Sequence, residues 1–140
     1  MTAKRRIGDR EVYPVGLGCM NITHAYGPPM DEADAKALLV RALDLGYDFL
    51  DTATLYGFGR SEELIGQALK DRRDSYFLAS KCVLGFKDGQ RTLDARPESI
   101  KAACEASLKR LQTEAIDLYY MHRPDPNVPI EDSVGALADL

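Results

Sequence analysis

The feature that most constrains the fold of this sequence is a repeated alternation between short apolar segments and longer segments with helical periodicity. Four short segments are typical of buried strands, and they occupy residues 15–20, 47–51, 76–80 and 116–121. Four segments with an apolar stripe follow them, at residues 31–45, from residue 61, from residue 97, and at residues 128–140. Because strands that alternate with helices form parallel sheets with right-handed crossovers, the sequence predicts an α/β fold.

Local signals support several of these boundaries. Asp31 is a favourable N-cap and Gly46 a favourable C-terminal residue for the first helix. Ser61 is expected to cap the second helix, and Pro97 suits the first position of the third. Residues 4–14 carry a Gly-Asp pair between two short strand-like segments, which predicts an N-terminal β-hairpin.

Two architectures fit four successive βα units: an open doubly wound sheet, or half of an eight-fold barrel. The open sheet usually carries Gly-x-Gly-x-x-Gly after its first strand, but Gly16 and Gly18 lack a third glycine at the required position. We therefore expect a (β/α)8 barrel of the TIM type. Because a full barrel takes about 250 residues, residues 1–140 are expected to be a single domain with only the first four βα units, truncated at its C-terminus.

Composition excludes several classes of protein. Hydrophobic residues make up 45% of the chain and charged residues 29%, which is ordinary for a globular protein. The net charge of −4 and the short basic cluster at Lys4–Arg6 argue against nucleic acid as a partner. No segment approaches the roughly 20 apolar residues of a membrane span. Three cysteines without a Cys-x-x-Cys pair predict neither a disulfide framework nor a zinc site, so we expect reduced thiols and a cytoplasmic protein.

Four titratable side chains fall where the expected strands end. Asp51 ends the second strand with Tyr56 in the loop behind it, Lys81 follows the third strand, and His122 follows the fourth. In a parallel barrel the carboxyl ends of the strands line one mouth, which is where active sites lie. Singly, each residue could be a solvated strand end or a surface residue. Their coincidence at one edge favours a common site.

These four residues suit one kind of chemistry. The Lys81 ammonium would stabilise the phenolate form of Tyr56, and Asp51 would keep that lysine charged. His122 could donate a hydrogen bond to a carbonyl oxygen. Such a site protonates a carbonyl oxygen while hydride reaches the carbonyl carbon. Because no side chain donates hydride, a nicotinamide or a flavin is required.

Longer stretches of the sequence resemble a known family. GLGCM at residues 16–20, GYDFLDTATLYG at 46–57, SK at 80–81 and SLKRLQTEAIDLYYMHRPDP at 107–126 are similar to the N-terminal half of the aldo-keto reductases. The resemblance covers essentially all of the chain. It implies a (β/α)8 barrel that reduces aldehydes or ketones to alcohols with a nicotinamide cofactor, usually NADPH.

The resemblance also implies roles for individual residues. Tyr56 would be the proton donor, Lys81 and Asp51 its supporting pair, and His122 the residue that orients the substrate carbonyl. The implied cofactor contacts lie at the ends of the first two strands, at Gly18, Cys19, Met20 and Asp51. The implied partner is a small carbonyl compound, whose identity the sequence leaves open together with the choice between NADPH and NADH.

Alternatives remain at this point. In the family, strands five to eight supply most of the cofactor site and are expected to lie outside these residues. A catalytically inactive fragment, or a half-barrel that serves as a binding module, is therefore the main alternative. The two open edges of a four-stranded sheet also predict self-association.

Two other enzymatic readings fit less well. Lys81 could form a Schiff base, but that chemistry needs a neutral amine and a neighbouring Asp51 favours the charged form. A metal site through His24 and His122 lacks the spacing of known histidine motifs, so we expect no metal. His24 is instead expected to be a loop or substrate-pocket residue.

Overall fold

The structure is a computed structural model that describes residues 3–24 and 26–140. Its centre is a parallel sheet with the strand order β3-β4-β5-β8. These strands are β3 (Leu17–Gly18), β4 (Phe49–Asp51), β5 (Phe77–Cys82) and β8 (Leu118–Met121). Their order in space follows their order in the chain, as in a barrel, whereas a doubly wound sheet reverses direction at a switch point. The predicted α/β fold with four βα units is confirmed.

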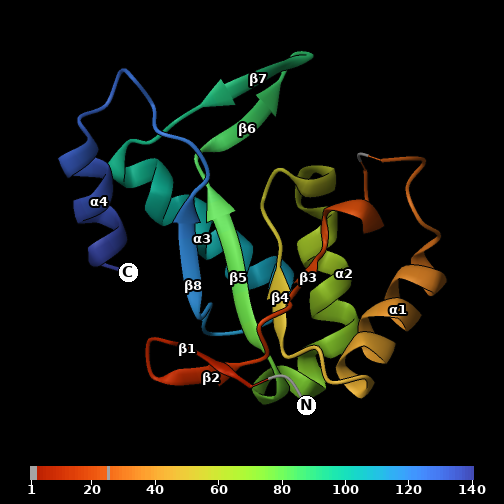
Figure 1. The fold of residues 1–140 in the computed structure, drawn as a ribbon. Helices are drawn as coiled ribbons and strands as arrows, with labels where there is room; N and C mark the ends of the chain where they lie inside the picture. The colour runs from red at the N-terminus through yellow and green to blue at the C-terminus, as the bar shows by residue number, and fades with distance from the viewer. Residues whose placement is uncertain (1–2, 25) are drawn as a thin grey trace.

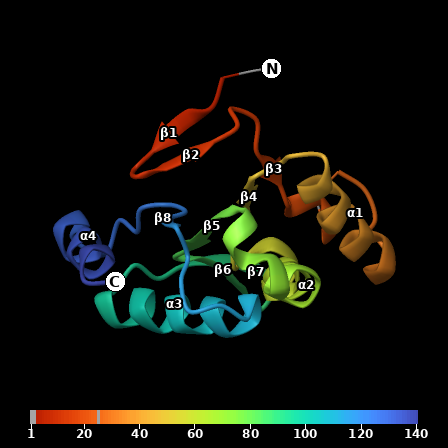
Figure 2. The same cartoon turned by 90° about the horizontal axis from the view of Figure 1, so that it is seen from below.

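Four helices follow the four strands in turn. They are α1 (Glu32–Asp44), α2 (Arg60–Leu69), α3 (Pro97–Leu111) and α4 (Ile130–Ala138). Figures 1 and 2 show that the helices form an arc along one side of the sheet, as the outer layer of a barrel does. Within the described residues, none of the helices has the length and apolar character needed to cross a membrane.

The apolar core lies between this arc and the sheet. The larger cluster joins helices α1 and α2 to strands β4 and β5, and includes the fully buried Leu39, Leu50, Ile65 and Leu78. A smaller cluster joins β5, α3 and α4 around Ile100. Helices α2 and α3 approach closely at Gly66, where an added Cβ would lie 2.5 Å from the carbonyl oxygen of Arg110.

Most predicted helix boundaries are confirmed, and one is wrong. The Asp31 carboxylate accepts a hydrogen bond of 2.8 Å from the Ala33 amide at the start of α1, and Pro97 begins α3. Ser61 does not cap α2, because the N-cap is Gly59 and the helix begins at Arg60. Three consecutive residues with positive φ, 57–59, bring the chain into the helix before Ser61 is reached.

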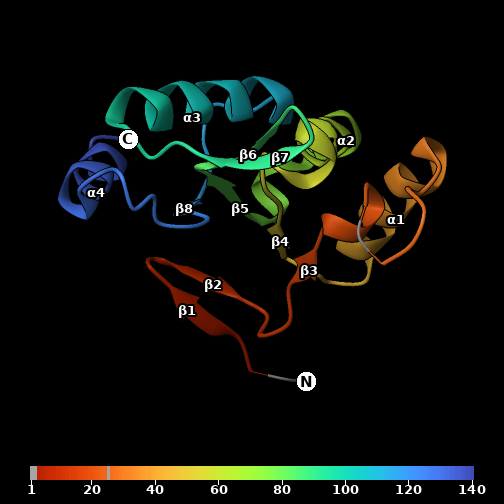
Figure 3. The same ribbon diagram turned by 90° about the horizontal axis from the view of Figure 1, so that it is seen from above.

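Two antiparallel hairpins accompany the sheet. The predicted N-terminal hairpin is confirmed as β1 (Arg5–Ile7) and β2 (Arg10–Val12), near the amino ends of the parallel strands (Figure 1). A second hairpin, β6 (Leu84–Lys87) and β7 (Gln90–Leu93), was not anticipated. It follows β5 directly and extends from the carboxyl end of the sheet towards α2 (Figure 3). The connection between β5 and α3 therefore contains a hairpin that was not predicted from the sequence.

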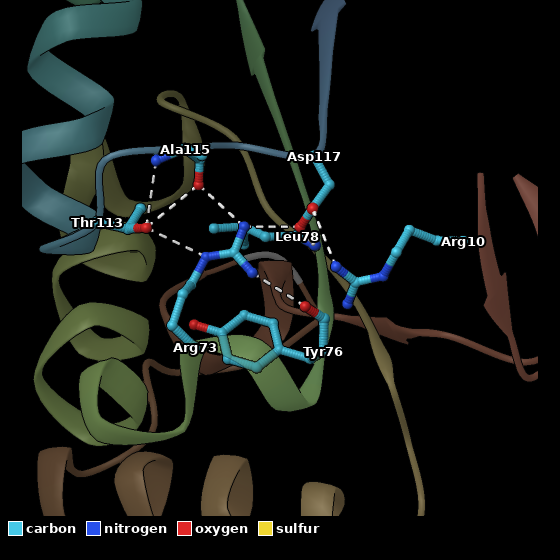
Figure 4. A network of polar contacts seen from close by, with 7 residues as sticks. All are labelled: Arg10, Arg73, Tyr76, Leu78, Thr113, Ala115 and Asp117. Atoms are coloured by element: carbon cyan, nitrogen blue, oxygen red, sulfur yellow. Dashed lines mark hydrogen bonds and ion pairs between the residues drawn. The ribbon is translucent and has the colours of Figure 1, made fainter. Parts of the chain in front are cut away.

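The amino end of the sheet is held by a polar network around Arg73, which lies in the 3-10 segment η3 (Lys70–Ser75) (Figure 4). The Arg73 side chain donates hydrogen bonds to the carbonyl oxygens of Tyr76 and Ala115, the Thr113 hydroxyl and the Asp117 carboxylate. Asp117 Oδ2 also accepts a bond of 2.7 Å from the Leu78 amide, and Arg10 Nη1 lies 3.9 Å from Asp117 Oδ1. This network ties β5, β8 and the N-terminal hairpin together at the end opposite to the candidate site.

Candidate active site at the carboxyl end of the sheet

The four titratable residues singled out in the sequence meet at the carboxyl end of the parallel sheet. Asp51 is the last residue of β4, Lys81 is the penultimate residue of β5, and His122 directly follows β8. Tyr56 begins the short 3-10 segment η2 (Tyr56–Gly59) behind β4. The backbone amide of His122 donates a hydrogen bond of 3.1 Å to the carbonyl oxygen of Cys82, which continues the ladder past β8 and fixes the position of His122.

The Lys81 ammonium bridges the other members of the site. Lys81 Nζ donates to Asp51 Oδ1 at 2.5 Å, to the Tyr56 hydroxyl oxygen at 3.0 Å and to the carbonyl oxygen of Thr52 at 2.9 Å. These three bonds use all three donors of an ammonium group. The Lys81 side chain is only 14% exposed and that of Asp51 is 36% exposed. The lysine is thus a fixed, charged neighbour of the tyrosine hydroxyl.

The ring of Tyr56 lies near two imidazoles. Its centroid lies 5.9 Å from that of His122 with the planes at 85°, and 5.7 Å from that of His24. His24 Nδ1 accepts a hydrogen bond of 3.3 Å from the Gly57 amide, which ties the loop after β3 to the turn behind β4. His24, which was expected to be a loop or substrate-pocket residue rather than a metal ligand, therefore adjoins the site. No sequence motif pointed to this contact.

His122 is set up to be a neutral imidazole at neutral pH. Burial lowers the pKa of His122, and the positive charges of Lys81 and Arg123 lower it further, while Asp51 opposes this. Its Nδ1 atom is buried and has no hydrogen-bond partner among the described residues. A neutral imidazole carries one N–H group, which can donate to a carbonyl oxygen.

The end of β3 lies beside Asp51, as parallel pairing of Gly18 with Asp51 requires. Gly18 is exposed, with no atom within 4 Å of where a Cβ would lie, and Met20 is half-buried. Cys19 is fully buried, and its amide donates to the carbonyl oxygen of Asp51 at 2.8 Å. Burial and the charge of Asp51 raise the pKa of the Cys19 thiol to about 12. Gly18 and Met20 offer surface to a ligand, whereas the Cys19 side chain does not.

Ser61 and Glu62 support the site from helix α2. The Ser61 hydroxyl donates to the carbonyl oxygen of Cys19 at 3.0 Å, and so fixes the chain after β3. Glu62 is fully buried, and its carboxylate accepts from the Ser80 hydroxyl at 2.6 Å and from Arg110 Nε at 2.7 Å. Because Ser80 faces Glu62, the next residue, Lys81, points to the other face of the sheet.

Glu62 was not among the residues predicted for the site. A signal for its role was nevertheless present, since Glu62 lies on the same helical stripe as the buried Ile65 and Leu69. A carboxylate at such a position needs a buried partner.

A cavity of about 500 Å³ adjoins the site. Leu55 and Gly57, the residues on either side of Tyr56, both line it, and so does His24. The site therefore combines a tyrosine hydroxyl, a fixed cation and a neutral imidazole beside a cavity of the size that binds small molecules. Chemically, this set can deliver a proton to an oxygen atom and stabilise the negative charge that the transfer leaves behind.

The sequence matches a known protein family. Residues 14–140 match the sequence model of the aldo/keto reductase family. The chain is 43% identical over 139 positions to the aldo-keto reductase yakc [NADP(+)] of Schizosaccharomyces pombe, and the match covers 95% of this chain and 40% of that protein. A probable aldo-keto reductase from Glycine max is 42% identical, with 93% of this chain and 38% of that protein covered.

Solved structures agree with this match. The holo form of an aldo-keto reductase from Bacillus halodurans superimposes with a TM-score of 0.88 at 37% identity, and the match covers 100% of this chain and 46% of that one. The chain thus spans less than half the length of each of these relatives. With a family match that extends over residues 14–140, the chain belongs to the aldo/keto reductase family.

Proposed function

We propose that the protein reduces an aldehyde or ketone to the alcohol with hydride from NADPH, and that Tyr56 donates the proton. The observation that carries the proposal is the position of Lys81, whose ammonium contacts the Tyr56 hydroxyl at 3.0 Å and the Asp51 carboxylate at 2.5 Å. A phenol in contact with a fixed cation is suited to lose a proton, because the cation stabilises the phenolate.

Each member of the group has a distinct task in this proposal. Tyr56 gives its proton to the carbonyl oxygen as negative charge develops there. Lys81 stabilises the resulting phenolate, and Asp51 holds the lysine in place and charged. His122, as a neutral imidazole, donates a hydrogen bond to the same carbonyl oxygen and orients the substrate. The hydroxyl and the imidazole then act on one oxygen atom from two directions.

The side chains of the site can supply a proton but no hydride. Their chemistry therefore complements that of a nicotinamide cofactor. A bound nicotinamide supplies that hydride. The open surface at Gly18 and the half-buried Met20, next to Asp51, would hold it. Two relatives support NADPH as the cofactor: the Schizosaccharomyces pombe protein carries NADP(+) in its name, and an aldo-keto reductase from Klebsiella pneumoniae (TM-score 0.76, 31% identity, 100% of this chain and 45% of that one) was crystallised with NADPH.

We further propose that residues 1–140 act as one aldo-keto reductase domain with a small carbonyl compound as its partner. The alternative function is that of a half-barrel that binds ligands without turnover. The chain spans 40% of the length of the Schizosaccharomyces pombe relative.

Isotope transfer separates these two functions. NADPH carrying two deuterium atoms at C4 of the nicotinamide is incubated with the protein and either benzaldehyde or propanal, and the alcohol is analysed by mass spectrometry. We expect one deuterium at the former carbonyl carbon. Saturable NADPH binding without deuterated alcohol from either aldehyde would establish the binding module and overturn the reductase. A Tyr47→Phe variant serves as a matched control, because Tyr47 precedes β4 at the opposite end of the sheet.

A further inference from the structure

One nitrogen atom of His24 accepts a hydrogen bond from the turn that carries Tyr56. The Gly57 amide, directly after Tyr56, donates to His24 Nδ1 over 3.3 Å. Because an amide N–H group can only donate, Nδ1 must offer its lone pair and carries no proton itself. The hydrogen of a neutral His24 ring then resides on Nε2. The geometry of this backbone bond thus fixes both the charge and the tautomer of the imidazole.

The residue before His24 packs against the same glycine. Gly57 has a φ of 59°, and an added Cβ there would lie 2.6 Å from Thr23 Cβ, so the turn and the loop after β3 are in direct contact. Thr23 Oγ1 lies 3.4 Å from His24 Nδ1 and 3.2 Å from the carbonyl oxygen of Met20. Its hydroxyl proton can go to either acceptor, and neither choice places a proton on Nδ1. This second contact therefore agrees with the first.

The turn that follows Tyr56 needs a partner of this kind. Residues 57–59 all have positive φ, a conformation that persists in folded chains only where the surroundings hold it. The amides on either side of Gly57 donate to carbonyl oxygens three residues earlier, whereas the Gly57 amide donates to His24. The centroids of the His24 and Tyr56 rings lie 5.7 Å apart. The imidazole is thus a bonded partner of the turn and a neighbour of the phenol.

The backbone of His24 leads back to the open surface proposed for the nicotinamide. The carbonyl oxygen of Met20 accepts hydrogen bonds from the Thr23 amide at 3.2 Å and from the His24 amide at 3.1 Å. These two bonds close a tight turn after β3. A continuous series of contacts therefore runs from Met20 through His24 to Gly57 and Tyr56.

From these contacts we infer that His24 is a positioning residue for Tyr56, and that it acts only as a neutral imidazole with its proton on Nε2. It fixes the turn behind β4 and thereby the Tyr56 hydroxyl, which lies 3.0 Å from Lys81 Nζ. A protonated ring has no lone pair at Nδ1 and releases the Gly57 amide. The inference rests on the proposed function for the role of Tyr56, and adds to it the residue that positions the proton donor.

Several charged and titratable side chains share the cavity wall or the candidate site with His24. They are Glu32, Arg60 and Arg91 in the wall, and Tyr56, Lys81 and His122 in the site. Glu32 is paired with Arg60. Of these types of side chain, only histidine ordinarily changes charge in mild acid. Separate observation of the two histidines therefore isolates the effect of acid on the Gly57 bond.

NMR of the imidazole nitrogens tests the protonation state directly. The protein is labelled with 15N in histidine, and correlations between the ring nitrogens and the ring C–H protons distinguish a bare nitrogen from a protonated one. We expect His24 at neutral pH to show a bare Nδ1 and a protonated Nε2. His24→Asn lacks these signals and so assigns them. A protonated Nδ1 would overturn the inference, because such a nitrogen cannot accept from Gly57.

Two substitutions separate the hydrogen bond from the ring. His24→Asn carries an oxygen at the position along the side chain that Nδ1 occupies, and so retains an acceptor. His24→Phe retains a ring and has no acceptor. Protection of the Gly57 amide against hydrogen exchange should be about fivefold lower in His24→Phe, the scale of one lost hydrogen bond, and nearly unchanged in His24→Asn. In the original chain this protection should fall in step with protonation of His24.

Two controls distinguish a local effect from a loss of stability. The Phe77 amide donates to the carbonyl oxygen of Asp48 at the opposite end of the sheet and serves as the reference. Tyr26→Phe, in the same loop at a residue that is 86% exposed, is the matched control and should leave Gly57 protection unchanged. Equal losses of protection at Phe77 and Gly57 in His24→Phe would show that His24 only stabilises the fold, and would overturn its positioning role.

Kinetics connect the contact to turnover. With NADPH and benzaldehyde, kcat of His24→Phe should fall about tenfold, because the Tyr56 hydroxyl is no longer fixed, while His24→Asn should retain most of the activity. Equal kcat in His24→Phe and the original chain would overturn the positioning role even if deuterium transfer succeeds. Failure of deuterium transfer, with a bare Nδ1 and His24-dependent protection of Gly57, would contradict the reductase proposal alone and would support His24 as the residue that fixes the turn.

Discussion

Lys81 Nζ lies 3.0 Å from the Tyr56 hydroxyl oxygen and 4.8 Å from the centroid of the same ring, so that the ammonium group faces both the polar end and the π-system of the tyrosine. The two residues are 25 positions apart in sequence. Parallel pairing of β4 with β5 brings them together, because it places Asp51 opposite Ala79, two residues before Lys81. Strand register thus brings Lys81 beside Asp51, and the turn after β4 brings Tyr56 to the same lysine.

Replacement of Lys81 by methionine should lower kcat for aldehyde reduction by about 100-fold, the usual scale of an effect on general acid catalysis. Methionine keeps most of the length of the side chain and removes the charge that stabilises the phenolate of Tyr56. Steady-state kinetics with NADPH and benzaldehyde measure the effect. Lys109→Met on the exposed side of α3 is the matched control. Equal kcat values for the two variants would remove the lysine charge from the mechanism.

The same lysine should not form a covalent intermediate. Lys81 uses its three donors in hydrogen bonds, one of them to Asp51, and a paired ammonium is a poor nucleophile. Borohydride added to the protein with benzaldehyde should therefore leave the mass of residue 81 unchanged in a peptide digest. A reduced adduct on Lys81 would support the Schiff-base reading instead.

The ionisation of His122 should make the protein less stable in mild acid. Its pKa is lowered from an ordinary 6.5, first by burial and then by Lys81 and Arg123. The unfolded chain therefore binds more protons than the folded one as pH falls below about 6.5, and the free energy of unfolding decreases until His122 is protonated in the fold as well. Urea denaturation at a series of pH values measures this loss.

Substitution isolates the contribution of this histidine. In His122→Gln the part of the pH dependence that lies just below pH 6.5 should diminish. In Arg123→Gln the NMR titration midpoint of His122 should move upwards, because one of the charges that lower its pKa is gone. A midpoint at or above 6.5 in the original chain would show that the ring is not held neutral.

The Arg73 network predicts a stability effect that is separate from chemistry. Asp117→Asn removes the charge that pairs with Arg73 and weakens the acceptor for the Leu78 amide, so the free energy of unfolding should fall by about 2 kcal/mol. Urea denaturation provides the measurement. Asp74→Asn, at an exposed position of η3, should change it by less than about 0.5 kcal/mol. Equal stabilities of the two variants would mean that the network contributes little.

The polypeptide of residues 1–140 should self-associate. Strands β3 and β8 are the two edges of its parallel sheet, and an unpaired strand edge is a template for pairing with another chain. Exposed apolar side chains lie near both edges, with Leu45 and Tyr47 on the β3 side and Ile130 and Val134 on α4. Light scattering after size exclusion should give a mass above 15.5 kDa. A monodisperse monomer that unfolds cooperatively would contradict this expectation.

Much of this architecture could be predicted from sequence because apolar periodicity and capping residues report local structure directly. The strand and helix order and the meeting of Asp51, Lys81 and His122 at one edge followed from that pattern. The hairpin β6–β7 was missed because its strands are largely exposed and carry little apolar signal. The pair Asp88-Gly89, with φ values of 50° and 81°, was the available signal for its turn.

Other features depend on tertiary contacts that no local sequence pattern indicates. Serine is a common N-cap residue, but the three residues with positive φ at 57–59 make the helix begin before Ser61. The Ser61 hydroxyl is therefore available to donate a hydrogen bond to the carbonyl oxygen of Cys19. The contact between Phe58 and Phe86 joins η2 to strand β6, and neither residue belongs to a recognisable motif.

The most direct test of the central claim is the kcat of a Tyr56→Phe variant for benzaldehyde reduction, measured together with the dissociation constant for NADPH. Loss of the hydroxyl removes the proton donor but keeps the ring that lies near His24 and His122. We predict a fall in kcat of about 100-fold or more with little change in NADPH affinity. Turnover equal to that of the original protein would contradict the role of Tyr56.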